Sequence, residues 1–87
     1  MTVRWTKRAA THLESIYRYI ARDKPEAARA LVADLFAATE ILTRHAEIGR
    51  RGRRSGTREL VKPPCLIVYH VKGDVVSIDA VIHGSRK

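Results

Sequence analysis

Gly49-Arg-Arg-Gly-Arg-Arg-Ser-Gly-Thr-Arg-Glu-Leu60 divides the chain into two halves with different hydrophobic patterns. Before this stretch, apolar residues recur at helical spacing, and after it they follow the alternation that is typical of strands. The stretch itself combines glycines, which interrupt regular structure, with a cluster of arginines. It therefore marks the boundary between a helical half and a sheet half.

The helical half is predicted to contain a short strand and two helices. Thr2–Trp5 alternates as an edge or entry strand does, and helical periodicity begins at Lys7, with Thr6 as a candidate N-cap. Pro25 then ends one helix and starts the next, because proline is tolerated in a first helical turn and not in a helix interior. The short connection predicts an antiparallel helical hairpin.

The sheet half is predicted to contain three strands. Cys65–Val71 and Val75–Ile82 flank a turn in which Gly73-Asp74 forms a two-residue hairpin loop. Thr57–Val61 predicts a further strand before them, and we expect Pro63-Pro64 to exclude continuous pairing between that strand and the next. The fold class is therefore α+β, in the order β-α-α-β-β-β, with an antiparallel sheet packed against an N-terminal helical hairpin.

The predicted hairpin register assigns each strand residue to one of two faces. Tyr69 pairs with Ile78, and in continuous register Ile67 would pair with Ala80 and Cys65 with Ile82, which gives one wholly apolar or amphipathic face. The opposite face is mixed, and it carries these residues of the two strands: Leu66, Val68, His70, Ser77, Asp79 and Val81, with His83 at the end. His70 and Asp79 could meet diagonally across the hairpin, as an oriented base or as a surface pair.

Length and composition set the class of protein. The 87 residues are 45% hydrophobic and 30% charged, which predicts one globular domain over residues 1–87. Cys65 is the only cysteine and the four histidines are scattered, so we expect no disulfide, no metal site and no cofactor. Neither a secretory signal nor a long apolar stretch is present, and a cytoplasmic location without membrane contact is therefore expected.

Positive charge is concentrated in the sheet half. Residues 1–49 contain eight Lys and Arg against six Asp and Glu, and residues 50–87 contain nine against three, so six of the eight net charges lie in the last 38 residues. Four of these basic residues are clustered: Arg50, Arg51, Arg53 and Arg54. Such a cluster favours a polyanion or an acidic protein partner, although a solvated loop is an equally good interpretation.

Several short sequence segments occur in the order in which a known family has them. They are Tyr19-Ile20-Ala21 before Pro25, Gly49-Arg50 leading to Gly56-Thr57-Arg58-Glu59-Leu60, Ile67-Val68-Tyr69, and Val81-Ile82-His83. Together they resemble the RelE/ParE superfamily of toxins from type II toxin–antitoxin systems, and its ParE-like branch in particular. The resemblance covers essentially the whole chain. It implies a cytoplasmic protein held inactive by a cognate antitoxin, and DNA contact only through that antitoxin.

The superfamily contains two activities on one fold, so the fold alone does not choose between them. ParE-like members are understood to inhibit DNA gyrase by protein contact, whereas RelE-like members cut mRNA on the ribosome without a metal. In this chain the nuclease interpretation would use Arg58, His83 and Arg86. Leu66 stands where RelE-like nucleases carry an arginine, and this departure counts against cleavage.

The favoured interpretation is therefore a toxin that inhibits gyrase through a protein-binding surface, with no catalytic residue of its own. The basic residues expected on this surface are Arg50, Arg51, Arg53, Arg54, Arg58 and Arg86, and the apolar residues are Leu66, Val68 and Val81. The alternatives are the ribosome-dependent mRNA endonuclease and a nontoxic binding module.

Overall fold

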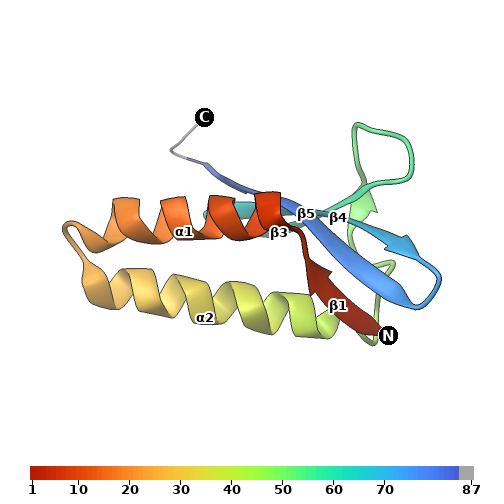
Figure 1. Ribbon diagram of the computed structural model, residues 1–87, viewed down its shortest axis with the longest axis horizontal. Coiled ribbons are helices and arrows are strands. Elements are labelled where there is room, and N and C mark those ends of the chain that lie inside the picture. The colour runs from red at the N-terminus through yellow and green to blue at the C-terminus, as the bar shows by residue number, and fades with distance from the viewer. Residues whose placement is uncertain (85–87) are drawn as a thin grey trace.

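The computed structural model describes residues 1–84 and contains two helices and five strands (Figure 1). The predicted strand, helical hairpin and three later strands are all present, and one short strand was not predicted. The elements are β1 (Thr2–Trp5), α1 (Lys7–Ala21), α2 (Pro25–Ile41), β2 (Arg50–Arg51), β3 (Arg58–Lys62), β4 (Cys65–Lys72) and β5 (Val75–His83). Neither helix is long and apolar enough to cross a membrane, a statement limited to residues 1–84.

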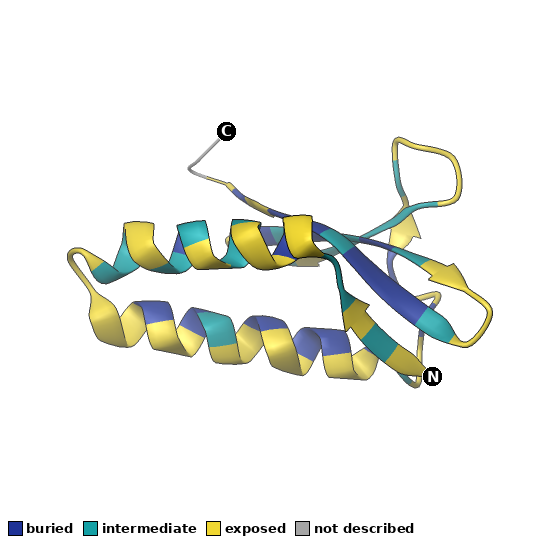
Figure 2. Ribbon diagram, viewed as in Figure 1, coloured by how far each residue is buried: buried dark blue, intermediate teal, exposed yellow. Residues whose placement is uncertain are grey.

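The strands form one sheet in the order β1-β5-β4-β3-β2, and the two helices lie against one of its faces (Figure 1). The core is between these layers, where Ile67 and Tyr69 of β4 are fully buried together with Ile78 of β5 and Leu35 of α2 (Figure 2). We call the helix-covered face of the sheet the inner face and the opposite one the outer face. The outer face is the surface on which partner-binding residues were predicted.

The start of α1 is fixed by the predicted cap. The Thr6 side chain accepts a hydrogen bond from the backbone N–H of Ala9 at 3.1 Å, and its hydroxyl donates to the carbonyl of Ile78 at 3.0 Å. A cap of this kind stabilises a helix by about 1 kcal/mol. Because Ile78 lies in β5, the same side chain also joins the helix to the sheet.

The sheet is mixed and not wholly antiparallel. β1 pairs with β5 in parallel, with Val3 opposite Val76 and Trp5 opposite Ile78. The other strand pairs are antiparallel, as predicted. The prediction of an antiparallel sheet was wrong for β1 because a strand that joins the sheet far from its sequence neighbours is not constrained by a tight turn.

Pro63-Pro64 connects β3 to β4 and does not interrupt their pairing. Lys62 lies opposite Cys65, and the ladder continues from this pair to Arg58 opposite Tyr69, with a cis peptide bond between the two prolines. The expectation that these prolines exclude continuous pairing was therefore wrong. Both prolines lie in the turn itself, outside the ladder, so no inter-strand hydrogen bond requires their missing N–H groups.

The hairpin of β4 and β5 contains an irregularity that changes the predicted faces. From Lys72 opposite Val75 to Tyr69 opposite Ile78 the register is as predicted, and Gly73 in the turn has a φ of +61°. At Val68/Tyr69 the register shifts, so Ile67 lies opposite Val81 and Cys65 opposite His83. Asp79 is the extra residue of this bulge, so the β5 residues beyond it lie on the face opposite to the predicted one, while the β4 residues keep their faces.

Candidate functional site

The basic stretch forms a hairpin loop at the edge of the sheet. Arg50 and Arg51 make the short strand β2 opposite Glu59 and Arg58, and residues 52–57 connect β2 to β3. Two backbone hydrogen bonds hold the loop, from the Gly52 N–H to the Thr57 carbonyl at 2.8 Å and from the Thr57 N–H to the Arg54 carbonyl at 3.1 Å. The basic stretch is therefore an ordered arm. We call residues 52–57 the arginine loop.

Glycine is required at two positions of this loop for different reasons. Gly56 has a φ of +83°, in the left-handed region that other residues rarely adopt. A Cβ on Gly52 would lie 2.3 Å from the Thr57 hydroxyl oxygen, so only glycine allows the two ends of the loop to approach this closely. The spacing of glycines in the sequence thus reflects the shape of the loop.

Two of the predicted partner-binding arginines have structural contacts of their own. The Arg50 Nε lies 3.2 Å from a carboxylate oxygen of Glu59. The Arg58 guanidinium donates to the backbone carbonyls of Glu47 at 3.1 Å and Gly49 at 2.8 Å, which ties β3 to the segment after α2. Arg58 is therefore part of the support for the loop as well as a positive charge.

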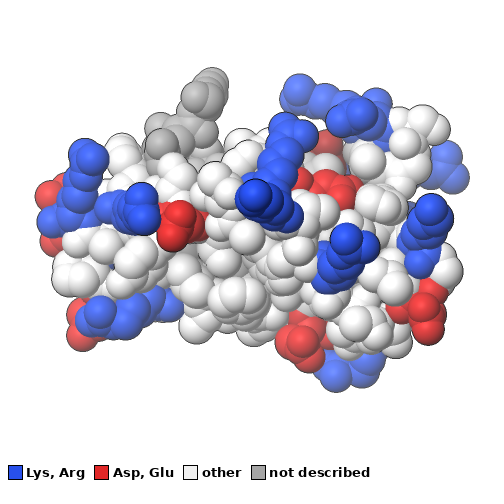
Figure 3. All heavy atoms as spheres, in the orientation of Figure 1, with Lys and Arg blue, Asp and Glu red and all other residues white. Residues whose placement is uncertain are grey.

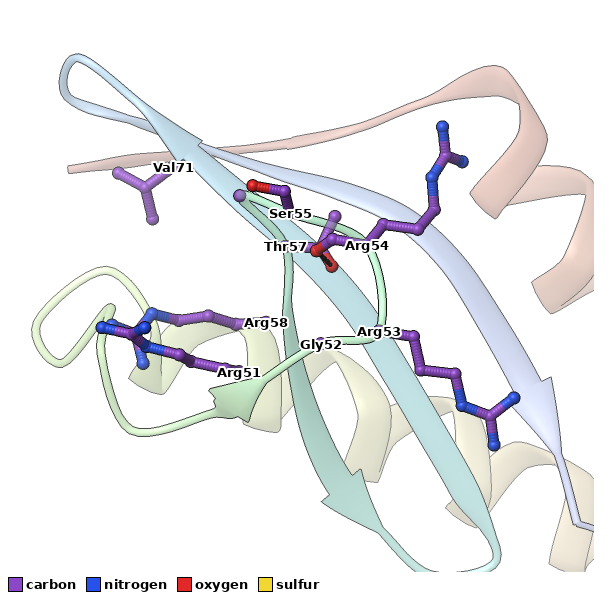
Figure 4. A pocket seen from close by; sticks show the side chains of 9 residues that line it. Arg51, Gly52, Arg53, Arg54, Ser55, Thr57, Arg58 and Val71 are labelled. Carbon is purple, nitrogen blue, oxygen red and sulfur yellow. Dashed lines mark hydrogen bonds between the residues drawn. The ribbon is translucent and has the colours of Figure 1, made fainter.

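The other three arginines of the cluster are exposed, and no carboxylate in residues 1–84 forms an ion pair with them. Arg51 points to the same side as Arg58, whereas Arg53 and Arg54 point to the other side (Figure 4). An open hollow of about 550 Å³ is lined by the arginine loop with Arg51, Arg58 and Val71. In Figure 3, Lys and Arg side chains gather at the end of the molecule that carries this loop. The structure thus supplies an ordered, unneutralised positive surface.

Next to Arg50 of β2, the outer face of the sheet carries an apolar patch. Leu66 lies opposite both Val61 of β3 and Ile82 of β5, and the exposed fractions of Val61 and Ile82 are 54% and 46%. Leu66 and Val68 are half-buried on the same face. We call Val61, Leu66, Val68 and Ile82 the apolar patch. Apolar side chains exposed next to a charged rim are typical of a protein-binding surface.

A polar cluster lies further along the same face. The His70 Nδ1 is 2.6 Å from an Asp79 carboxylate oxygen, and the Ser77 hydroxyl donates to the other carboxylate oxygen at 3.0 Å. The predicted encounter of His70 with Asp79 is confirmed. The described part of the chain contains no group of three or more His, Cys, Asp or Glu side chains arranged to hold a metal ion.

Comparisons with known proteins agree with this geometry. Residues 3–87 match the model of the family described as "ParE toxin of type II toxin-antitoxin system, parDE". A Sinorhizobium fredii protein with the name "Putative toxin Y4kP" is 39% identical over 87 residues, covering 98% of this chain and 90% of the relative. The chain belongs to the ParE toxin family. It is accordingly a toxin of a type II toxin–antitoxin system.

Solved structures of related systems show the same fold. A chain of the chromosomal ParDE system from P. aeruginosa superposes with a TM-score of 0.85 at 27% identity, with 95% of each chain covered. A chain of the RelBE2 toxin–antitoxin complex from Mycobacterium tuberculosis gives 0.67 at 25% identity, covering 94% of this chain and 95% of that one. The RelE/ParE-like fold of this toxin is therefore shown.

Val81 does not belong to the outer surface of the toxin, contrary to the prediction. It is 3% exposed and packs in the core, because the bulge turns it to the inner face. Ile82 takes its place on the outer face, and Val61 joins it from β3. Both residues were missed as patch members, and nothing in the local pattern of β5 distinguishes a bulged strand from a regular one.

The residues of the nuclease interpretation are not gathered into one open site by the described part of the toxin. His83 is only 7% exposed and its ring lies 6.2 Å from the Tyr19 ring, centroid to centroid. Arg58 contacts the two carbonyls described above. Arg86, which was predicted for both interpretations, lies outside the described residues.

Three further ionisable groups support the fold, Tyr69 and Cys65 within the core and His12 half-buried on α1. The Tyr69 hydroxyl is fully buried, and this burial raises its pKa. Burial likewise raises the pKa of the Cys65 thiol. Burial, with a smaller contribution from the nearby Arg8 charge, lowers the pKa of His12, whose Nδ1 accepts a hydrogen bond from the Val81 N–H at 3.2 Å. These groups belong to the support of the fold and not to its binding surface.

Proposed function

We propose that this toxin inhibits DNA gyrase by protein–protein contact, without catalysis of its own, and that a cognate antitoxin neutralises it in the cytoplasm. The apolar patch, bordered by the arginine loop, would be the contact surface. Its members are Val61, Leu66, Val68 and Ile82, and its positive border is formed by Arg50, Arg51, Arg53 and Arg54. This function is the one that the family resemblance implies for ParE-like members.

The observation that carries the proposal is the apolar character of the outer face at Leu66. Metal-independent cleavage of RNA requires cations around the phosphate that develops extra charge in the transition state. Leu66 instead has the apolar neighbours Val61 and Ile82 across the two adjacent strands. This environment favours burial against another protein and disfavours binding of the RNA phosphate at which cleavage would occur.

The arrangement of the remaining nuclease candidates supports the same choice. A general base must reach the proton that it removes, but the His83 side chain is 7% exposed. The Arg58 guanidinium already donates to two backbone carbonyls. Cleavage with these groups would require that both leave their present positions.

Charge supports association with an acidic antitoxin. The chain has a formal net charge of +8, and three exposed arginines of the cluster have no carboxylate partner in the described part of the chain. An antitoxin segment that carries carboxylates would be steered to this end of the toxin and could cover the apolar patch at the same time. DNA contact would then be made by the antitoxin.

A paired assay tests the proposal. Toxin purified free of antitoxin is added to gyrase in a supercoiling and cleavage-complex assay, and separately to translating ribosomes with a reporter mRNA. We expect inhibition of gyrase with the mRNA intact. Cuts in the mRNA with normal supercoiling would overturn the proposal in favour of the endonuclease, and no effect in either assay would favour a nontoxic binding module.

A further inference from the structure

A second hollow lies beside the apolar patch and is not used by the proposed function. It has a volume of about 510 Å³, between the arginine loop and the adjacent ends of β4 and β5. Arg54 and the loop residues 55–57 form one wall. The opposite wall is formed by His70, Val71, Lys72 and Asp79. A volume of this size is in the range of small-ligand sites.

His70 is oriented in this hollow by its neighbours. With its Nδ1 2.6 Å from Asp79, which also accepts from Ser77, the imidazole has one nitrogen fixed and the other, Nε2, without a hydrogen bond to any residue of 1–84. The side chain is 38% exposed. The ring therefore presents Nε2 as a positioned group, which is a hydrogen-bond donor when both ring nitrogens carry a proton.

The charges around His70 favour an anion. Arg54 comes from the loop and Lys72 from β4, and Arg4 of β1 lies opposite Ser77 on the same face. Asp79 is the one acidic side chain lining the hollow, and it is already occupied by His70 and Ser77. No carboxylate in residues 1–84 forms an ion pair with Arg4, Arg54 or Lys72.

The distribution of these donors fits a phosphate group better than a carboxylate. Arg54 comes from the loop wall and His70 and Lys72 from the β4 wall, so donors on two sides of the hollow suit a ligand whose acceptor oxygens point in different directions. The hydroxyl of Ser55 in the loop wall offers a further neutral donor.

From this geometry we propose that the hollow is a phosphate-binding site, with His70, Arg54 and Lys72 as its charged donors and Asp79 as the residue that positions His70. The phosphate is presented by a free nucleotide or by the backbone of a nucleic-acid strand. This site shares Arg54 with the positive border of the proposed gyrase contact, but it uses none of the four residues of the apolar patch, and His70 belongs to this site alone.

Binding of sulfate to the full chain tests the site directly. Sulfate is the probe because it has the tetrahedral oxygen arrangement of a phosphate group and, unlike phosphate, keeps one charge state near neutral pH. In an NMR titration we expect the His70 ring signals and the Arg54 amide to shift together and to saturate.

Variants with matched controls separate the site from general attraction to a basic protein. We expect His70→Gln to weaken sulfate binding by about tenfold, and Arg54→Gln to weaken it by a similar factor. The controls are His45→Gln and Arg22→Gln, which remove an exposed histidine and an exposed arginine far from the hollow in sequence. Equal weakening by the controls, or an absence of shifts at His70 in the unmodified chain, would overturn the proposal.

Competition then identifies the source of the phosphate. A nucleoside monophosphate, a DNA duplex and an RNA strand of the same sequence are each added to the sulfate-saturated chain, and release of sulfate from His70 is followed. Displacement by the monophosphate alone assigns the site to a free nucleotide, and displacement by a strand assigns it to nucleic acid. Failure of all three to displace sulfate would contradict the phosphate assignment. Gyrase inhibition by His70→Gln is expected to be unchanged, so the two proposals can fail separately.

Discussion

The backbone N–H of Gly49 donates a hydrogen bond to the Tyr69 hydroxyl at 3.0 Å, and the same hydroxyl donates to the Ala46 carbonyl at 2.6 Å. One buried side chain of β4 thus fixes the segment between α2 and β2, from which the arginine loop starts. The contact also explains why residue 49 is a glycine, because a Cβ at this position would lie 2.6 Å from the Tyr69 hydroxyl oxygen and 2.8 Å from the Tyr69 ring. The position of the basic loop therefore depends on a residue of the core.

Tyr69→Phe is predicted to destabilise the fold. The change leaves a buried N–H and a buried carbonyl without their partner, and such losses cost about 1 to 3 kcal/mol. The free energy of unfolding from urea titration measures the effect. Tyr17→Phe, on the half-buried surface of α1, is the control and should change the free energy of unfolding by less than about 0.5 kcal/mol. Equal effects of the two variants would contradict the role of the Tyr69 hydroxyl.

Stability is predicted to fall in mild acid because of His12. Its folded-state pKa is lowered, first by burial and then by Arg8, so the unfolded chain takes up a proton at this site more readily than the folded chain does. The contribution is fully present above the ordinary histidine pKa of about 6.5 and is lost as the pH falls through the lower folded value. Protonation would also remove the acceptor for the Val81 N–H.

Unfolding free energies measured across this pH range test the His12 prediction. Their decrease toward acid should be smaller in His12→Gln than in the unmodified chain, and His45→Gln, which changes an exposed side chain, should retain the full decrease. If His12→Gln and the unmodified chain have the same pH profile, the decrease has another origin.

The arginines of the basic stretch are predicted to differ in their role, with Arg58 contributing to stability and Arg53 to the rate of association with a partner. Arg58→Gln removes two charged donors from backbone carbonyls and should lower the free energy of unfolding by about 1 kcal/mol. Arg53→Gln should change it by less than about 0.5 kcal/mol, because the side chain is exposed and makes no ion pair in the described residues. Its effect should appear instead in the rate of association with an acidic partner and in the dependence of that rate on salt. A stability loss as large for Arg53→Gln as for Arg58→Gln would be the contrary result.

Leu66 and Val81 are predicted to respond in opposite ways to the same substitution. Val81→Asp places an unpaired carboxylate in the core and should cost about 3 kcal/mol or more, which a thermal melt followed by circular dichroism would show. Leu66→Asp should leave the fold intact and weaken binding to the target by at least about tenfold. Ile48→Asp, at an exposed apolar residue outside the patch, is the matched control for binding. Unchanged affinity in Leu66→Asp would remove Leu66 from the contact surface.

Much of the fold can be predicted from local signals in the sequence. Thr6, Pro25 and the Gly73-Asp74 turn each act on their immediate neighbours, and the structure has the cap, the helix start and the hairpin at these places. Parallel pairing of β1 with β5 was not predictable in this way, because it joins Thr2 to Val75 across most of the chain. Whether Pro63-Pro64 breaks a ladder or makes a turn also depends on the register around it.

The candidate site was predicted less completely, and the reason is a single irregularity. Alternation along β5 correctly places Ser77 and Asp79 on the outer face, and with them the pair of Asp79 and His70. Beyond the bulge the same alternation gives the opposite of the true faces, so Val81 was predicted in place of Ile82. A strand in which every residue from Ala80 to Ile82 is apolar gives no sign of the change of register.

The most direct test of contact inhibition is a titration of gyrase with toxin at a gyrase concentration well above the dissociation constant of the complex. An inhibitor that acts by contact should abolish supercoiling in proportion to the toxin added, with an end point at a fixed ratio of toxin to gyrase. Leu66→Asp should lose this end point and Ile48→Asp should keep it. Inhibition that increases with incubation time and becomes complete with far less toxin than gyrase would indicate turnover. That result would contradict a function based on contact alone.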